Sequence, residues 1–429
     1  MKGYKIPYIN ETIYKSELDN GLSIFLLPRK NSRQVLGALS VKCGSIDVKV
    51  KLNNRLKSFP IGIAHFLEHK LFESEGIMTD FSINGAIPNG HTLFDRTTYT
   101  FSCNGNLLDN IRNLFSILNI EKITAESIKI EKEIIIKEVN LKNSDPTWKG
   151  IFSLLHSLYE DHPVKYSIGG TEESISQITS DLLKDYFSLF YQPTNMIFVL
   201  VGDFDVNEVL ECLNDINKVP EYKSLSEIQS VFSEETPVIK KRHSFDYMSI
   251  NTPYLFIGWK DINICKLKNN ELYENSILNA LILDSIFGKS SIIYHNLIEN
   301  GLVEREITWD YYGGTSYGFS YVEVVTKEPK KIERYINDYL FKVLDSRIDE
   351  ELFESCRKKA IGRYISSFDS LNTLSSHVLE WAHKDCNYFD TIDILNSFSC
   401  KDANVRLKSL LANERMAIFN LLPKVSSFN

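Results

Sequence analysis

The sequence predicts an α+β protein built from two structurally similar halves, each an α/β sandwich. Each half runs in the same order, with strands, a helix, a strand, further helices and a closing strand, which indicates a weak internal repeat. The strands are interrupted by helices without regular βαβ spacing, which points to α+β. A polar segment rich in Ser and Glu separates the halves. We therefore expect an N-terminal domain at residues 1–222, a linker at 223–236 and a C-terminal domain at 237–429.

The elements of the first half follow from its apolar periodicity and its turn residues. Asp19-Asn20-Gly21 predicts a turn between the first two strands, and Pro88-Asn89-Gly90 predicts a second turn before the strand at 97–102. We expect strands at 12–28 (two strands around the first turn), 34–42, 97–102 and 196–202, and helices at 62–73, 107–118, 124–141, 182–191 and 206–213.

The second half repeats this pattern. Its long apolar helix, 272–287, stands where the first half has the helix 62–73. We expect strands at 254–259, 317–325 and 416–422, with helices at 330–345, 350–367 and 371–385.

Composition limits the classes of function. A content of 43% hydrophobic and 24% charged residues in 429 is ordinary for a soluble globular protein, and the net charge of −8 argues against nucleic acid as the main partner. The number of cysteines, seven, is odd, and no Cys-x-x-Cys occurs, so we expect free thiols. No apolar run approaches the length of a membrane span, and residues 1–10 lack the apolar core of a secretory signal. We expect a cytoplasmic protein.

The segment 62–73 carries the functional motif. As a helix it places His65, Glu68 and His69 on one face, and the apolar residues on the rest of its surface predict that the helix is buried. A buried helix should not carry two imidazoles and a carboxylate on one face unless something satisfies them. Two histidines one turn apart can hold one zinc ion, and the glutamate between them can reach a water on that ion.

The order His-x-x-Glu-His is the inverse of that in ordinary zinc proteases and defines the inverzincin motif. The alternative is a buried pair of histidines hydrogen-bonded to a glutamate. Because the chain has only nine histidines, composition alone would produce the motif on the order of 0.01 times in such a chain. The pattern therefore favours a metal site.

A catalytic zinc ion takes three protein ligands and keeps one open position. Glu73 follows on the same helix, but one helix cannot wrap three ligands tetrahedrally while its glutamate also reaches the water. Glu131 and Glu138 are better candidates, since they are seven residues apart on the apolar side of the helix 124–141. The same helix is equally compatible with a surface helix that has ion pairs such as Glu133–Lys137, so these residues alone leave the third ligand open.

These segments together resemble the pitrilysin/insulinase family, which includes the mitochondrial processing peptidases. That family pairs His-x-x-Glu-His with a downstream Glu-x₆-Glu whose last glutamate binds zinc, as 62–73 and 131–138 do here. Asn89-Gly90 and Arg96-Thr-Thr-Tyr99 are similar to the family's Asn-Ala turn and substrate-binding edge strand, and Ile168-Gly-Gly-Thr171 to a later landmark. The run His-Phe-Leu-Glu-His-Lys-Leu-Phe-Glu is most similar to the bacterial members.

The resemblance implies a set of roles around one Zn²⁺ per chain. The zinc ligands would be His65, His69 and Glu138, and Glu68 would be the general base. Glu131 would orient a ligand imidazole through the N–H that does not face the metal.

The resemblance also implies a place for the peptide. Asn89 and Gly90 would hold the substrate backbone, with the peptide lying as an added strand against 97–102. His91 lies beside them and is either a further contact or an ordinary polar loop residue.

The chain departs from the family in its second half. Active members carry an Arg and a Tyr, seven residues apart, that contact the substrate carbonyl near the zinc. Those positions fall at Leu297 and Glu304 here, while an Arg–Tyr pair with the same spacing, Arg305 and Tyr312, lies eight residues late. We therefore expect a paralogous, zinc-less partner subunit that supplies this pair and closes a dimeric chamber, with a homodimer as the alternative.

These observations predict a zinc-dependent endopeptidase, a hydrolase acting on small or unfolded peptides. Its substrates could be leader peptides of ribosomally made peptides or general cell peptides. The alternative is a non-catalytic assembly subunit related to the family, which the intact set of His65, Glu68, His69 and Glu138 argues against.

Overall fold

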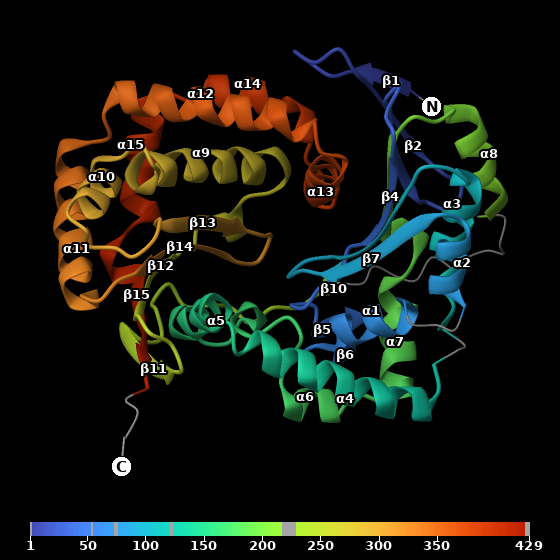
Figure 1. Ribbon diagram of the computed structural model, residues 1–429, viewed down its shortest axis with the longest axis horizontal. Helices are drawn as coiled ribbons and strands as arrows, with labels where there is room; N and C mark the ends of the chain where they lie inside the picture. The colour runs from blue at the N-terminus through green and yellow to red at the C-terminus, as the bar shows by residue number, and fades with distance from the viewer. Residues whose placement is uncertain (1, 53–54, 73–75, 121–122, 217–228, 425–429) are drawn as a thin grey trace. The chain divides into compact units, whose positions relative to one another are not determined.

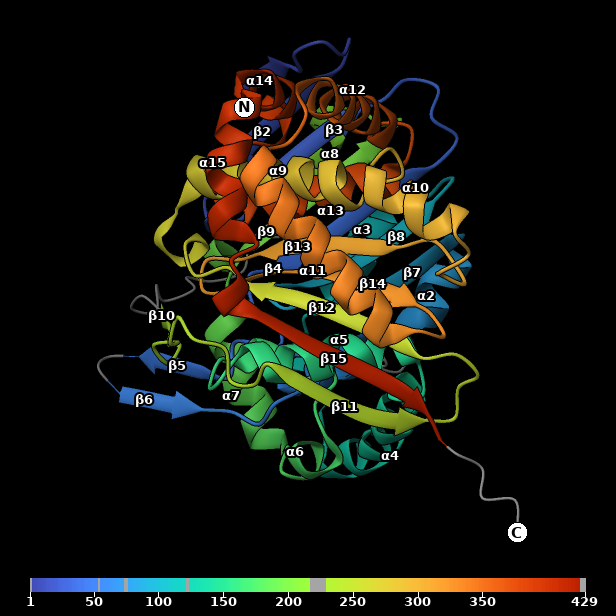
Figure 2. The ribbon, with the colours of Figure 1, turned by 90° about the vertical axis from the view of Figure 1, so that its left-hand side faces the viewer.

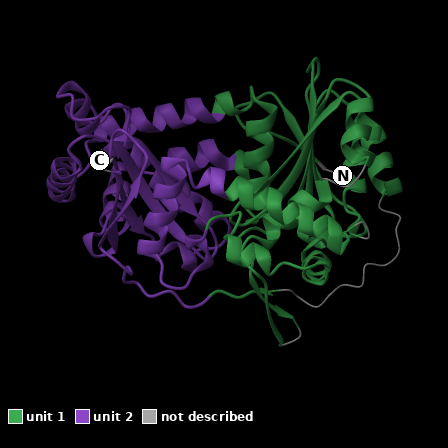
Figure 3. Ribbon diagram, turned by 60° about the horizontal axis from the view of Figure 1, so that its bottom comes forward, with its two compact units in different colours: residues 1–139, 167–232, 365–389 green, residues 140–166, 233–364, 390–429 purple. Residues whose placement is uncertain are grey.

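The computed structural model describes residues 2–52, 55–72, 76–120, 123–216 and 229–424. The chain forms two compact units, coloured separately in Figure 3. Unit 1 consists of Met1–Val139, Ser167–Phe232 and Ile365–Phe389, and unit 2 of Asn140–Tyr166, Ser233–Tyr364 and Asp390–Asn429. Each unit thus includes a segment from the other half of the sequence.

Unit 1 is organised around a seven-stranded sheet, part of which is visible in Figure 1. A small second sheet has the order β10-β5-β6 and consists of Gln229–Ser230, Lys49–Leu52 and Arg55–Ser58. The strands of the large sheet, in spatial order, are β1 (Lys2–Lys5), β2 (Thr12–Glu17), β3 (Ser23–Pro28), β9 (Met196–Gly202), β4 (Val35–Val41), β8 (Thr97–Cys103) and β7 (Ala86–Thr92).

Unit 2 is organised around a five-stranded sheet, and Figure 2 shows β11, β15 and β12 running side by side. In spatial order the strands are β11 (His243–Met248), β15 (Met416–Pro423), β12 (Tyr254–Lys260), β14 (Gly318–Val325) and β13 (Thr308–Gly313).

The two sheets confirm the internal repeat. The order β3-β9-β4-β8-β7 in unit 1 matches β11-β15-β12-β14-β13 in unit 2, and in both the first pair is parallel and the others are antiparallel. Helix α1 (Ile63–Phe72) lies between β4 and β7 in the sequence, as α9 (Asn269–Phe287) lies between β12 and β13. The prediction that α9 occupies the place of the motif-bearing helix is therefore confirmed.

Some of the helices pack on these sheets, whereas others pack on α9. The helices outside α1 and α9 are α2 (Ile77–Ile83), α3 (Leu107–Ser116), α4 (Ala125–Lys142), α5 (Pro146–Leu158), α6 (Glu172–Ser176), α7 (Ser180–Phe190), α8 (Val206–Ile216), α10 (Ile292–Glu299), α11 (Pro329–Ser346), α12 (Glu350–Ser367), α13 (Leu371–Ala382), α14 (Thr391–Ser397) and α15 (Cys400–Leu410). Of these, α10, α14 and α15 pack on α9. Short 3₁₀ turns lie at Pro163–Lys165, Pro193–Asn195, Ile264–Lys266, Tyr388–Asp390 and Asn413–Arg415.

Two helices are exchanged between the halves of the sequence. Helix α5, from the first half, packs on β12 and β15 of unit 2, where a Cβ on Gly150 would come within 2.1 Å of the Phe256 ring. Helix α13, from the second half, packs on β4 and β9 of unit 1. The chain changes unit inside α4 and inside α12. One cut of the sequence therefore does not separate the two packed units, and the homologous boundary at 223–236, partly outside the described residues, stays a prediction.

The structure corrects two expectations about the segment after α2. Pro88, Asn89 and Gly90 do not form a turn, because they are paired in strand β7 with Phe101, Thr100 and Tyr99 of β8. Strand 97–103 is not an edge strand, since β4 flanks it on one side and β7 on the other. Pairing with β8 overrides the local turn propensity of Asn-Gly, and β7 is the edge of the sheet.

The stretch 269–299, which contains α9 and α10, is long and apolar enough by composition to cross a membrane. Its composition is weak evidence for a membrane span, since 67% of its most apolar stretch is buried inside the protein. Leu281, Ile282 and Leu283 of α9 belong to the apolar core of unit 2. All seven cysteines are free, as predicted.

Candidate metal centre

The start of helix α1 is set by close backbone contacts with the loop 167–170. Gly62 has φ +88°, and a Cβ there would lie 2.6 Å from the carbonyl oxygen of Gly169. Gly169 also lies beside the metal motif, because a Cβ on it would meet Val139 at 2.8 Å and the His65 ring at 3.6 Å. The loop thus occupies the space between α1 and α4 only because residue 169 has no side chain.

Helices α1 and α4 bring together three side chains of the types that ligate metals. One ligand atom from each of His65, His69 and Glu138 lies within 4.8 Å of the others. Glu138 faces both imidazoles, with its oxygens 3.7 Å from His65 Nε2 and 3.3 Å from His69 Nε2. Within the described residues no other group of this kind occurs, and Glu73 lies outside them.

Glu131 orients His69 from behind. Its side chain is fully buried, and Oε1 lies 3.0 Å from His69 Nδ1. A proton on Nδ1 satisfies this contact and leaves the Nε2 lone pair directed towards Glu138. Lys70 lies 3.4 Å from the other oxygen of Glu131 and partly neutralises it, a contact that the sequence pattern did not reveal.

The charges at this site call for a cation. Burial lowers the pKa of His69, but the hydrogen bonds that its ring donates to Glu131 and Glu138 outweigh burial and raise the pKa to about 10. Three carboxyl groups, those of Glu68, Glu131 and Glu138, surround the two imidazoles, and Lys70 lies beside one of them. Without a metal, protonation of His69 supplies one positive charge among these carboxyl groups. A divalent cation bound at the site would supply two.

Glu68 is held beside the metal-binding group but takes no part in it. It is 7% exposed, and its Oε2 accepts a 2.7 Å hydrogen bond from Thr92 Oγ1. Its other oxygen, Oε1, faces the backbone of β7, since a Cβ on Gly90 would lie only 2.8 Å from it. Sequence reasoning missed Thr92, whose position becomes informative only once 86–92 is known to be a strand that places it on the same face as Gly90.

Strand β7 presents an open edge next to Glu68 in the part of the chain that the structure describes. Leu93 N–H donates to the Arg96 carbonyl at 2.8 Å and closes the β7–β8 hairpin. Alternation in an antiparallel pair then directs the backbone groups of Pro88, Gly90 and Thr92 away from β8. Pro88 has no N–H, so Gly90 and Thr92 supply the donors at this edge.

The other two predicted substrate contacts differ in their surroundings. Asn89 is exposed, and its Oδ1 accepts a 2.9 Å hydrogen bond from Gly90 N–H, so its amide lies along the open edge. His91 is half-buried, and burial, with the Arg96 guanidinium, lowers its pKa. His91 does not belong to the metal-binding group.

The expected Arg–Tyr positions of unit 2 do not present a cation to a ligand. Leu297 is fully buried in the apolar core, and Glu304 forms a 3.1 Å ion pair with Lys327. Arg305 pairs with the buried Glu323, and Tyr312 stacks on Phe319 with ring centroids 5.0 Å apart. The guanidinium charge of Arg305 is thus already compensated within unit 2.

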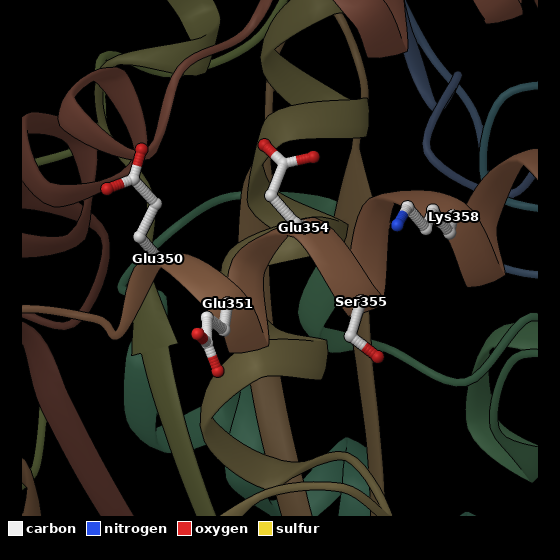
Figure 4. A pocket seen from close by; sticks show the side chains of 5 residues that line it. All are labelled: Glu350, Glu351, Glu354, Ser355 and Lys358. Carbon is white, nitrogen blue, oxygen red and sulfur yellow. The ribbon is translucent and has the colours of Figure 1, made fainter.

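A shallow hollow on α12 shows what an acidic cluster without a metal centre looks like (Figure 4). The carboxylates of Glu350, Glu351 and Glu354 do not converge on one point, and Glu354 pairs with Arg357. Acidic side chains on one exposed helix face, without an imidazole or a buried donor among them, have no geometry that selects a metal.

The chain belongs to the insulinase family, peptidase family M16. The family description "Insulinase (Peptidase family M16)" matches residues 24–172, and "Peptidase M16 inactive domain" matches residues 177–360. The uncharacterized zinc protease YmfH of Bacillus subtilis is 31% identical over 99% of this chain and 100% of its own length. The putative zinc protease AlbF of Bacillus subtilis is 27% identical over 48% of this chain and 49% of its own.

Solved structures show the same fold. A putative M16-like peptidase from Alicyclobacillus acidocaldarius has a TM-score of 0.93 at 28% identity, covering 98% of this chain and 100% of that one. Pitrilysin has a TM-score of 0.75 at 17% identity, with 98% of this chain matching 46% of the pitrilysin chain. The expected family and the expected two-half architecture are therefore confirmed.

Proposed function

We propose that this protein is a zinc-dependent endopeptidase that hydrolyses small or unfolded peptides. The observation that carries the proposal is the convergence of His65, His69 and Glu138, with Glu68 held beside them but outside the group. The names of the relatives, which are zinc proteases, support the same class of reaction.

The residues present fit zinc. Two imidazole nitrogens and one carboxylate oxygen are a donor set found at catalytic zinc sites, and such sites keep a fourth position open. The contact of Glu131 with His69 Nδ1 is the support that zinc-bound histidines usually have. When bound, zinc supplies Lewis-acid catalysis by making a water more acidic and polarising a peptide carbonyl.

The remaining chemistry falls to Glu68. Its Oε2 is occupied by the Thr92 hydroxyl, so Oε1 is the atom that accepts the proton of the attacking water and later returns it to the leaving amine. Because the carboxylate is nearly buried and held by Thr92, few orientations compete with the productive one.

The substrate binds as an added strand on β7. The N–H groups of Gly90 and Thr92 and the carbonyls of Pro88 and Gly90 form an edge that can pair with an extended peptide backbone. Such pairing recognises the backbone more than the side chains, which favours unfolded peptides that can extend fully. Asn89 gives up its contact with Gly90 to the incoming strand.

A partner subunit completes the enzyme. The burial of Leu297 and the pairing of Arg305 with Glu323 leave this chain without the substrate-facing Arg–Tyr pair that its resemblance led us to expect. We infer a cytoplasmic heterodimer with a zinc-less paralogue that carries the pair, or a homodimer, acting on leader peptides or general cell peptides.

The experiment is a peptide-library digest with measured zinc content. The wild-type chain should bind one zinc and cleave peptides, strongly only when mixed with the paralogue, while His65→Ala should lose the zinc. Full peptidase activity of the chain alone would refute the need for a paralogue and leave the homodimer as the active form. A zinc-loaded chain that is inactive alone and with every paralogue would refute the peptidase and leave an assembly role.

A further inference from the structure

Among the described strands β7 pairs with β8 alone, and helices α1 and α2 pack on it. The turn that follows β7 adds a further constraint on its position in front of Glu68. The hairpin turn 93–96 directly follows Thr92 and is held on one side by the loop after β4. Ser45 N–H donates to the Leu93 carbonyl at 2.9 Å, and Ile46 N–H donates to that of Phe94 at 3.1 Å. These bonds hold the backbone of the turn but do not involve its charged side chains, which contact another element.

The other side of the turn meets the end of α13, the helix that the second half of the chain supplies to unit 1. Four charged side chains form what we call the turn cluster: Asp95 and Arg96 of the turn, and Glu380 and Lys384 of the α13 segment. Lys384 Nζ lies 3.6 Å from Asp95 Oδ2 and 3.2 Å from Glu380 Oε1. Arg96 lies 3.0 Å from Asp95 and 3.7 Å from Glu380.

The cations of the turn cluster are buried, whereas the side chains of Asp95 and Glu380 are 25% and 30% exposed. Arg96 and Lys384 are each 7% exposed, so both cations are nearly out of water. Burial raises the pKa of Asp95, but Lys384 and Arg96 outweigh it and hold the pKa at about 2. The same two cations lower the pKa of Glu380 against the opposing effect of burial. Asp95 and Glu380 therefore stay ionised at neutral pH.

A neighbouring contact ties the same segment to the sheet. His383 Nε2 lies 2.8 Å from Ser40 Oγ of β4, and that hydroxyl lies 2.9 Å from Thr98 Oγ1 of β8. Burial, together with Arg96, lowers the pKa of His383 to about 3, so its ring is neutral and adds no charge to the cluster. Thr98 faces the side of β8 opposite to Thr97, whose hydroxyl faces Thr92.

An ion cluster with buried cations is poor evidence for stability, because desolvation of the charges offsets most of the Coulomb energy between them. Such a cluster does, however, require one specific geometry of its side chains. We propose that the turn cluster fixes the position of β7 relative to the carboxylate of Glu68. Glu380 and Lys384 act as positioning residues, and both come from the half of the chain that lacks the metal motif. This inference rests on the proposed function, and it makes the second half part of the substrate-binding apparatus of unit 1.

The test uses Lys384→Met and Glu380→Gln in the full-length chain, assayed with its active partner. We expect KM for an extended peptide to rise ~10-fold, because a displacement of β7 by a fraction of an ångström weakens its pairing with the substrate backbone. The kcat and the zinc content should stay nearly unchanged. Lys384→Arg keeps the charge and should restore most of the lost affinity. Lys359→Met, which breaks the ion pair with the buried Asp284 in unit 2, controls for general loss of a buried charge and should leave KM unchanged.

A second measurement does not depend on activity. Hydrogen exchange of the backbone amides in 86–92 should become faster in Lys384→Met and stay at the wild-type rate in Lys359→Met, with or without peptidase activity. If Lys384→Met shows the wild-type exchange rate in 86–92 and an unchanged KM, the proposal is overturned. Faster exchange in Lys384→Met, combined with a wild-type protein that cleaves no peptide, would overturn the peptidase function and retain the positioning role of the turn cluster.

Discussion

Glu131 offers the sharpest test of how the site is built. Glu131→Gln keeps the size of the side chain and an oxygen that can accept a hydrogen bond from His69 Nδ1. In the wild-type protein Nδ1 lies 3.0 Å from Glu131 Oε1. It removes the negative charge, so a charge-assisted hydrogen bond becomes a neutral one and Lys70 loses its anionic contact. The imidazole becomes a poorer donor to zinc and is less firmly oriented.

The magnitude follows from the position of the group. Removal of such a support for a zinc-bound histidine costs about 10–100-fold in metal affinity, or roughly 1.4–2.7 kcal/mol. Because Glu131 is fully buried and Lys70 remains beside it, we expect the upper part of that range. Loss of hydrolysis at limiting zinc should follow the loss of affinity.

The assay is zinc competition against a chromogenic chelator, with Glu133→Gln as the matched control. Glu133 lies on the same helix and is exposed, so its variant should bind zinc like the wild type. Thermal unfolding of both variants in excess chelator separates metal affinity from folding. A folded Glu131→Gln protein that binds zinc as tightly as Glu133→Gln would show that the contact with His69 has no bearing on the metal.

Three further changes have defined outcomes. Glu68→Gln should retain zinc and lower kcat by about 10²–10⁴-fold, and normal kcat in a zinc-loaded variant would exclude Glu68 as the base. Thr92→Val should lower kcat by ~10-fold while Thr92→Ser stays close to wild type, which steady-state kinetics would reveal. Burial raises the pKa of Asp47 to about 7, against hydrogen bonds from Ser230 and Gly44. Its protonated form therefore stabilises the fold below pH ~4, and this contribution of roughly 4 kcal/mol is lost as the pH rises through 7. Urea unfolding should show that Asp47→Asn removes this decline, and an unchanged pH dependence would contradict the assignment.

The metal motif was predictable because its information is local. The spacing of His65, Glu68 and His69 on a helix with an otherwise apolar surface requires no knowledge of the fold, and the structure places the first and last of them together. The participation of Glu138 rested on family resemblance, because helical periodicity could not distinguish a buried carboxylate pair from a surface helix. Ile134 illustrates the limit, since it shares the supposed apolar side but is 40% exposed.

The edge strand was predicted wrongly because its cause is not local. Pro88-Asn89-Gly90 has the composition of a turn, and only pairing with residues 99–101 makes it a strand. The roles of Thr92 and Lys70 depend on which side chains reach Glu68 and Glu131 across the fold. The exchange of α5 and α13 between the halves could not be predicted, since the sequence of neither helix indicates which of the two sheets it packs on.

That exchange has a consequence for how the protein can be taken apart. A fragment ending near residue 222 would keep the metal ligands but expose the face of β4 and β9 that α13 covers, and the complementary fragment would lack α5 against β12 and β15. Neither piece is a self-sufficient folding unit, so a nick in the connecting segment should leave the two pieces associated, and separately expressed pieces should become soluble only when they are made together.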